Sequence, residues 1–157
     1  MRGYLLDTNH VEAFFRKEPS IIQKVRTIPA ERLIWVCSIT LGEIEAGHAM
    51  TQTTNQTVRD EYVKFVRDNF LDFRLDVSEF TPEQYAKIMR RIWRKHPPSS
   101  SNKKTEQHLL DLGVDINDVW LVAVALEHGL TFVTRDKMTC IKEAVGVESF
   151  DNWLEVK

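Results

Sequence analysis

The chain has 157 residues, of which 43% are hydrophobic and 28% are charged, and its formal net charge is −2. This length favours one domain over residues 1–157. The net charge gives no overall positive signal for nucleic-acid binding, although a pocket of carboxylates would itself lower the net charge. No apolar run approaches the ~20 residues that span a bilayer. We therefore expect no membrane contact, and because Cys37 and Cys140 form no motif, we expect free thiols and a cytoplasmic location.

Short apolar runs alternate with stretches of helical periodicity along the chain. In chain order we expect a strand over 3–7, helices over 9–16 and 19–28, a strand over 33–37, helices over 40–50 and 55–71 separated by a polar break at 51–57, a short strand over 73–77, helices over 82–95, 104–112 and 116–128, a strand over 130–134, a helix over 138–144, and a strand or turn at 147–149. This alternation predicts an α/β fold with a central, mainly parallel sheet flanked by helices.

Acidic residues fall where the predicted strands end. Asp7 ends the first strand, and Asp136 follows the strand over 130–134 by two residues. Glu43 lies on the first turn of the helix expected from Thr40, and Asp118 lies on the first turn of the apolar helix over 116–128. Because ligands bind outside the carboxyl ends of parallel strands, these four carboxylates could share one edge of the sheet.

Clustered carboxylates repel one another, at about 4 kcal/mol for two charges 4 Å apart at an effective dielectric near 20. Such a cluster is sensible only if its members lose their protons unevenly or bind cations. Hard oxygen ligands, with no His or Cys in motif spacing, suit Mg²⁺ or Mn²⁺ rather than Zn²⁺.

Each acid also has a purely structural interpretation. Asp7 could cap the next helix, and Thr40-x-x-Glu43 fits a capping box. Asp115 could be the N-cap of the helix from Ile116, with Asp118 as its partner, and Asp136 could be an ordinary turn acid. Taken singly, each structural interpretation is the more common one, but the ordered set at matching strand ends favours a shared site.

The chain resembles the PIN-domain family and, within it, bacterial toxin ribonucleases of the VapC type. The resemblance spans nearly the whole chain and rests on Leu6-Asp7-Thr8-Asn9, on Ser38-Ile39-Thr40-Leu41-Gly42-Glu43-Ile44 with Gly47, on Ile116-Asn117-Asp118-Val119-Trp120-Leu121-Val122-Ala123 followed by Ala125-Leu126-Glu127-His128-Gly129-Leu130, on Val133-Thr134-Arg135-Asp136, and on the closing Asn152-Trp153.

The resemblance implies a three-layer PIN-like fold and a Mg²⁺-dependent endoribonuclease, with Mn²⁺ as a possible substitute. By motif, the catalytic and metal-binding acids are Asp7, Glu43, Asp118 and Asp136, and the supporting residues are Thr8, Asn9 and Thr134. Asp115 competes for the third position, but the Asn117-Asp118 pair carries the motif, so we prefer Asp118. The resemblance further implies a homodimer and a VapB-like antitoxin protein that occludes the pocket.

Within this site, Asp7 and Asp136 are the expected direct metal ligands, and Glu43 could act through water or accept its proton. Many relatives carry a further acid after the Asp136 position, whereas this chain has Lys137-Met138-Thr139, which indicates a weak second metal site. The Pro- and Ser-rich loop at 96–102 has no assigned role.

The helix over 82–95 carries a cationic stripe that could follow RNA phosphates, although a solvated surface face is the more common explanation. The stripe and the residues after the loop are Lys87, Arg90, Arg91, Arg94, Lys95, Lys103 and Lys104. Two other functions compete with the nuclease. A haloacid-dehalogenase-like phosphatase is disfavoured because its second acid would fall at Asn9. The alternative is a catalytically inactive PIN-like RNA-binding or protein-interaction module.

Overall fold

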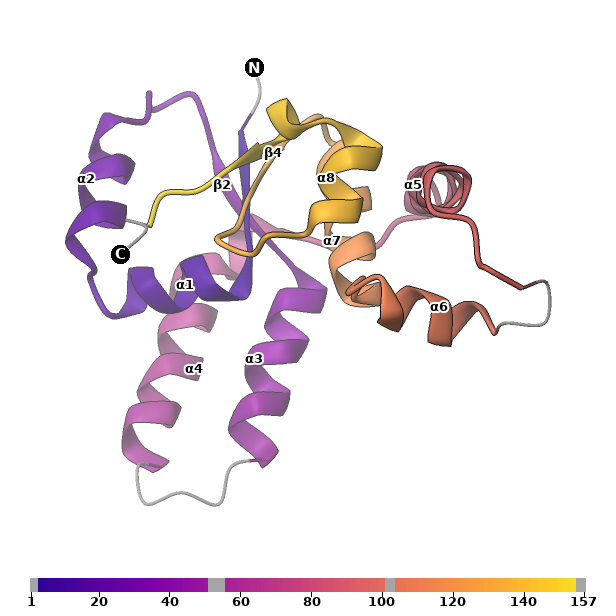
Figure 1. The fold of residues 1–157 in the computed structure, drawn as a ribbon. Helices are drawn as coiled ribbons and strands as arrows, with labels where there is room; N and C mark the ends of the chain where they lie inside the picture. The colour runs from indigo at the N-terminus through magenta and orange to yellow at the C-terminus, as the bar shows by residue number, and fades with distance from the viewer. Residues whose placement is uncertain (1–2, 51–55, 101–103, 155–157) are drawn as a thin grey trace.

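The sheet confirms the predicted α/β class. Figure 1 shows a computed structural model of the chain, and the structure describes residues 3–50, 56–100 and 104–154. Within these ranges five strands form one sheet in the order β3-β2-β1-β4-β5, and every pairing is parallel. The strands are β1 (Tyr4–Leu6), β2 (Ile34–Cys37), β3 (Arg74–Leu75), β4 (Thr131–Val133) and β5 (Phe150–Asp151). The segment 147–149 is a 3-10 turn that precedes β5.

The central strand β1 shows why the fold has three layers. Leu5 and Leu6 are both fully buried, but they belong to separate hydrophobic cores because successive side chains of a strand point to opposite faces. Both strands beside β1 are paired in register, with Leu6 opposite Val36 and Val133. A strand buried on both faces and at both edges has to be apolar throughout, as the run Tyr4-Leu5-Leu6 is.

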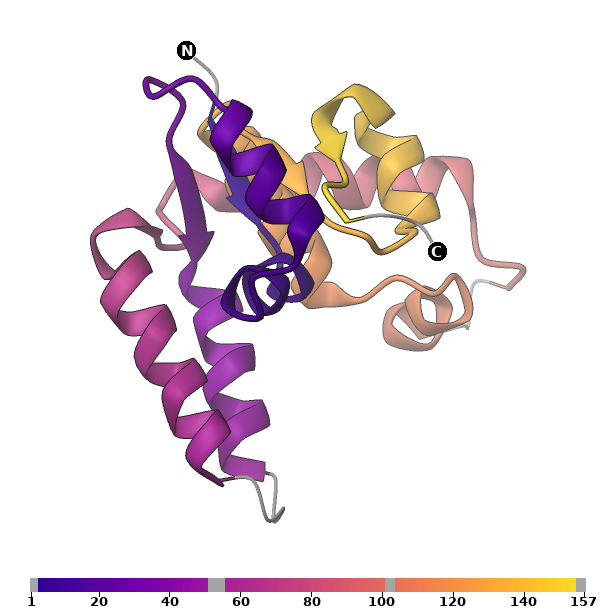
Figure 2. The same ribbon diagram turned by 90° about the vertical axis from the view of Figure 1, so that its left-hand side faces the viewer.

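Helices cover both faces of the sheet (Figures 1 and 2). The Leu6 face packs against α1 (Thr8–Phe15), α2 (Pro19–Thr27), α3 (Ser38–Met50) and α4 (Gln56–Phe70). The Leu5 face packs against α5 (Thr81–Lys95), α6 (Thr105–Asp111), α7 (Ile116–Glu127) and α8 (Thr139–Val145). The predicted sheet flanked by helices on both sides is therefore confirmed.

Helix α7 is nearly devoid of charge because it lies in the centre of the second core. Six of its residues are buried, and its only ionisable side chains are Asp118 in the first turn and Glu127 at the end. The helix is followed by Gly129, whose φ of 62° is left-handed, as the predicted helix stop requires. A carboxylate at the start of such a helix therefore lies at the edge of the core.

Helices α3 and α4 run side by side and extend beyond the sheet (Figures 1 and 2). Helix α3 begins at Ser38, directly after β2, whereas the sequence predicted a start near Thr40. Glu43 consequently lies on the second turn of α3 and not, as expected, on the first. Most of the predicted polar break at 51–57 lies outside the described residues. Among the residues that are described, no helix is long and apolar enough to cross a membrane.

Candidate active site

Asp7 is the buried centre of the candidate site. It follows β1 and caps α1, and only 4% of its surface is exposed. Its Oδ1 accepts a hydrogen bond from the backbone N–H of Thr8 at 2.7 Å, and its Oδ2 accepts one from the hydroxyl of Thr134 at 2.7 Å. Burial raises the pKa of Asp7, these two hydrogen bonds oppose the rise, and the charges of Asp136 and Glu43 add to it. Asp7 therefore has both the structural role of a helix cap and a place among the acids.

Asn9 joins two of the predicted acids. Its Nδ2 donates to Oδ2 of Asp7 at 3.0 Å and to Oδ2 of Asp136 at 3.2 Å. Asp136 is fixed a second time, because its backbone N–H donates to the Thr134 hydroxyl at 3.0 Å. Hydrogen bonds thus connect residues that follow β1 with residues that follow β4, 127 positions apart in the sequence, as the strand-end argument predicts.

His10 fixes the orientation of Asn9. His10 is fully buried, its Nε2 accepts from the backbone N–H of Trp153 at 3.1 Å, and its Nδ1 lies 2.6 Å from Oδ1 of Asn9. An Nε2 that accepts leaves the proton on Nδ1, so His10 donates to Asn9. Burial is the main cause that lowers the pKa of His10 to about 4, and the ring is therefore neutral at pH 7.

Glu43 is held by two neutral donors from other elements. Its Oε2 accepts from the hydroxyl of Thr8 at 2.7 Å, and its Oε1 accepts from Nδ2 of Asn117 at 3.1 Å. The capping-box interpretation of Thr40 and Glu43 is wrong, because Thr40 lies inside α3, is fully buried, and has a hydroxyl without a partner among the described residues. The side chain of Glu43 instead forms its hydrogen bonds with Thr8 of α1 and Asn117 of α7.

Asp115 and Asp118 lie in different surroundings. The side chain of Asp115 accepts from the backbone N–H of Asn117 at 2.7 Å, so Asp115 is the N-cap of α7, as its structural interpretation predicts. Asp118 lies one turn further on, where burial and neighbouring negative charges raise its pKa to about 7. Those charges, in decreasing order of effect, belong to Asp7, Asp115, Asp136 and Glu43.

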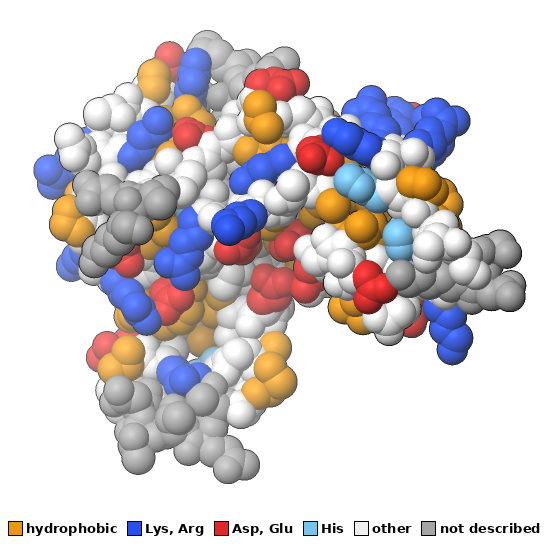
Figure 3. Space-filling view, viewed as in Figure 1, with side chains coloured by type: hydrophobic (Ala, Val, Ile, Leu, Met, Phe, Trp, Pro, Cys, Tyr) orange, Lys and Arg blue, Asp and Glu red, His pale blue; other side chains and the backbone are white. Residues whose placement is uncertain are grey.

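Asp7, Asp136 and Glu43 lie close enough to Asp118 for their charges to add to the rise that burial causes in its pKa. Figure 3 shows acidic side chains gathered near the centre of one face, with Lys and Arg side chains above and to the left of them. These oxygen donors fit a hard divalent cation, because a bound cation would offset both the burial and the repulsion that raise the pKa of Asp118. Within the described ranges, no three His, Cys, Asp or Glu side chains lie together as a group that could hold a metal ion. The amide group of Asn9 lies between the carboxylates of Asp7 and Asp136.

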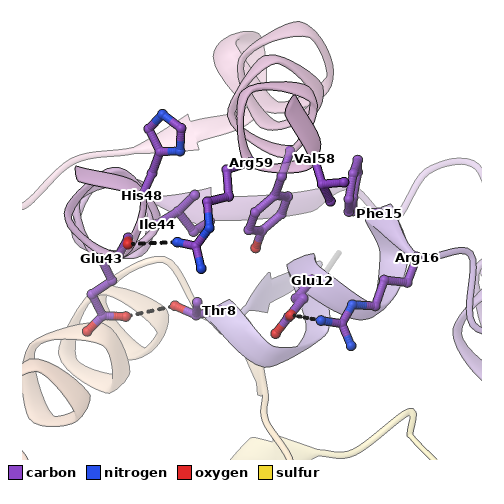
Figure 4. Close-up of a pocket in the computed structure, with 11 residues that line it drawn as sticks. Thr8, Glu12, Phe15, Arg16, Glu43, Ile44, His48, Val58 and Arg59 are labelled. Atoms are coloured by element: carbon purple, nitrogen blue, oxygen red, sulfur yellow. Dashed lines mark hydrogen bonds and ion pairs between the residues drawn. The ribbon is translucent and has the colours of Figure 1, made fainter. Parts of the chain in front are cut away.

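A cavity of about 480 Å³ adjoins the acids between α1, α3 and α4 (Figure 4). Thr8 and Glu43 lie on its wall, and Glu12 and Arg16 form an ion pair across from them. Its apolar lining comes from Phe15, Ile44, Val58 and Tyr62. A partner that filled this cavity would contact the same Thr8–Glu43 pair that borders the acid cluster.

The family model of the PIN domain matches residues 4–144, and the chain belongs to this family. The predicted resemblance is therefore confirmed. Comparison with curated proteins gives no match.

Solved structures with the same fold include three VapBC proteins. The chain is 15% identical to a chain of VapBC2 from Rickettsia felis bound to a promoter DNA fragment, covering 96% of this chain and 98% of that one with a TM-score of 0.69. It is 19% identical to DNA-bound VapBC from Salmonella typhimurium, with coverages of 98% and 100% and a TM-score of 0.68. It is 16% identical to VapBC-1 from nontypeable Haemophilus influenzae, with coverages of 96% and 97% and a TM-score of 0.67.

Sequence reasoning did not assign the site contacts of His10 and Asn117. His10 was visible only as a neighbour of Asn9, and its partner Trp153 lies 143 positions away. Asn117 belongs to the quoted motif, but the motif alone does not indicate a bond to Glu43.

Proposed function

We propose that the chain is a divalent-metal-dependent endoribonuclease that acts as the toxin of a toxin–antitoxin pair. The observation that carries the proposal is the grouping of four acids. Asp7, Glu43 and Asp136 lie close enough to Asp118 for their negative charges to raise its pKa further than burial alone does. A group of like charges at the edge of a core is costly unless a cation or a reaction uses it. PIN domains are generally nucleases, and the family match therefore supports a hydrolase that acts on nucleic acid.

The residues of the proposed site are either metal ligands or residues that take part in the proton transfer and position its carboxylate. Asp7 and Asp136 are the proposed direct ligands of Mg²⁺ or Mn²⁺, and Asp118 completes the set. A bound divalent cation would supply positive charge against the phosphate and acidify a water molecule. Glu43 is the proposed acceptor of the proton from the attacking water, and the donors from Thr8 and Asn117 fix both of its carboxylate oxygens.

An antitoxin is the proposed protein partner. The matched structures from Rickettsia felis and Salmonella typhimurium are VapBC proteins bound to DNA, and another match is FitAB bound to a DNA fragment. The cavity beside Thr8 and Glu43 is the proposed place where such a partner covers the acids, because its apolar wall and its charged rim lie next to them. A homodimer is proposed on the family resemblance.

The test is cleavage of a mixed cellular RNA pool by the purified, antitoxin-free chain, with Mg²⁺, with EDTA, and with an Asp7→Asn variant. We expect discrete fragments only with the metal and with Asp7 intact. Asp115→Ala is the matched control, since it removes a nearby acid that has a capping role, and it should still cleave. A folded protein that neither cleaves nor binds Mg²⁺ or Mn²⁺ in a titration would support the alternative, an inactive PIN-like binding module.

A further inference from the structure

We propose that the exposed cationic face of α5 binds the phosphate backbone of single-stranded RNA next to the bond that is cleaved. The inference rests on the proposed ribonuclease function and adds to it a surface, separate from the acids, that fixes the direction of the strand. Arg90 and Arg94 are the central residues of this α5 face, and Arg91 and Lys95 extend it.

The charge on α5 is one-sided. The helix buries Ile88 and Ile92 on one side, carries five Lys and Arg residues elsewhere, and contains one acid, Glu83. Glu83 pairs with Lys87 at 2.7 Å, whereas Arg90 and Arg94 are exposed and make no hydrogen bond or ion pair within the described part of the chain. Figure 3 shows Lys and Arg side chains gathered over α5. In a chain whose net charge is −2, this is a local excess that suits a polyanion.

An aromatic ring lies among these cations. Trp93 is 36% exposed, and its ring makes a T-shaped contact with the ring of His108 at a centroid separation of 5.3 Å. His108 is itself 5% exposed, and its Nε2 binds the backbone carbonyl of His96 at 2.7 Å. Trp93 is therefore held from one side and open on the other. Guanidinium groups beside an exposed indole are the combination that binds single-stranded nucleic acid by charge and base stacking.

Helix α8 connects the α5 face to the acids. Arg91 donates to the carbonyl of Ala144 at 3.1 Å, and Lys95 pairs with Glu143 at 3.2 Å, both near the end of α8. The other end of α8 begins at Thr139, three residues after Asp136. Seven helical residues span about 10 Å, which corresponds to roughly three phosphates of a stacked strand.

Glu143 limits the positive charge at the end of this surface nearest α8. Its carboxylate accepts from Lys95 and lies 3.0 Å from Nε2 of His96. This carboxylate would repel a phosphate that approached Lys95, so its removal should strengthen RNA binding while removal of Arg90 and Arg94 weakens it. Two changes of opposite sign separate an electrostatic role from a loss of structure.

The experiment measures binding of a fluorescein-labelled single-stranded RNA of about 20 nucleotides, by anisotropy, over a series of salt concentrations. Asp7→Asn serves as the background, so that the RNA is not cut. With Arg90→Ala and Arg94→Ala together, we expect weaker binding and a slope of log affinity against log salt that is smaller by about 1.4, or 0.7 per lost phosphate contact. Glu143→Gln should bind more tightly than the background.

The matched control is Lys64→Ala with Arg67→Ala, which removes two exposed cations from another helix, α4. It should leave the salt slope unchanged, and thermal melting by circular dichroism should show all variants folded. Cleavage of nested RNAs should also weaken when fewer than about three nucleotides remain on one side of the cut.

The inference and the proposed function fail in different ways. If the wild-type chain cleaves RNA but the Arg90→Ala and Arg94→Ala variant keeps the background salt slope, the α5 face does not bind the substrate. If that variant loses affinity for the antitoxin and not for RNA, the surface is a protein interface and the inference is wrong. If the wild-type chain cleaves no RNA, the failure lies in the proposed function.

Discussion

Nδ1 of His10 donates a hydrogen bond to Oδ1 of Asn9 at 2.6 Å, and this bond connects Trp153 to the acid cluster through His10, which also accepts from the backbone N–H of Trp153. The carbonyl oxygen of Asn9 accepts the short bond from His10 and a longer one from the backbone N–H of Arg135 at 3.5 Å, so its amide nitrogen faces the acids, where it donates to Asp7 and Asp136. A carboxamide in the opposite orientation would place an oxygen against two carboxylates. His10 therefore helps to orient Asn9 so that the acids face its amide nitrogen and not its oxygen.

Replacement of His10 by Phe should reduce both stability and turnover. The change leaves the backbone N–H of Trp153 without a partner and leaves Oδ1 of Asn9 with only the long bond from the backbone N–H of Arg135 at 3.5 Å, which we expect to cost about 2–4 kcal/mol of unfolding free energy. Because Asn9 is then held less firmly, kcat should fall roughly 10- to 100-fold while KM changes little. Urea unfolding and steady-state cleavage measure the two effects. His10→Gln keeps a donor and an acceptor, and it should recover part of the turnover; if it does not, the orienting role is wrong.

The depressed pKa of His10 predicts a loss of stability in acid. The folded state has a pKa of about 4 for this ring, whereas the unfolded chain has the ordinary 6.5, so the unfolded state binds more protons between these values. Stability should be constant above pH 6.5 and should fall by about 3 kcal/mol as the pH drops from 6.5 to 4. Urea unfolding at several pH values tests this. The His10→Gln variant should lack that part of the slope, and an identical slope in both proteins would contradict the assignment.

Asp115 and Asp118 should respond in opposite ways to replacement. Asp115→Ala removes a helix cap and should lower the unfolding free energy by about 1 kcal/mol while cleavage continues. Asp118→Asn should abolish cleavage while the fold survives. Melting curves and a cleavage assay on both variants check the pair of outcomes. Loss of cleavage in Asp115→Ala with retention in Asp118→Asn would transfer the catalytic role to Asp115.

Thr8→Val tests how Glu43 is held. Valine has nearly the shape of threonine but removes the hydroxyl that donates to Oε2 of Glu43. With one of its two donors gone, Glu43 should be positioned less well, and we expect kcat to fall roughly 10- to 100-fold. Thr8→Ser, which retains the hydroxyl, is the control and should keep most of the activity in the same cleavage assay. Equal activity of both variants would show that this bond is not needed.

The parts of the site that lie at strand ends could be predicted from sequence, because strand ends have fixed neighbours. Asp7 and Asp136 follow apolar strands that pair in parallel, and the geometry of the sheet brings them together without further information. The position of Glu43 depended on where α3 begins. Ser38 follows β2 without a loop, so the helix starts two residues earlier than the Thr40 signal indicated. His10 and Asn117 required tertiary contacts that no local pattern encodes.

The raised pKa of Asp118 predicts how divalent metal and pH act together on stability. The folded pKa is about 7 and the unfolded value is 3.8, so without metal the chain should lose about 1–3 kcal/mol as the pH rises from 4 to 7, after allowance for solvent screening. In EDTA at pH 8, Asp118→Asn should therefore be more stable than the wild type by about this amount. At pH 4 the two proteins should be equal.

Mg²⁺ should offset most or all of this difference at pH 8. A cation at 100 times its dissociation constant stabilises the folded state by about 2.7 kcal/mol, and the effect requires ionised ligands. The wild type should gain this stability at pH 8 and much less at pH 5.5, where protons compete for Asp118, whereas Asp118→Asn should gain little at either pH. Urea unfolding with Mg²⁺ and with EDTA at both pH values measures all four differences. A gain in Asp118→Asn equal to that of the wild type would show that the metal binds elsewhere.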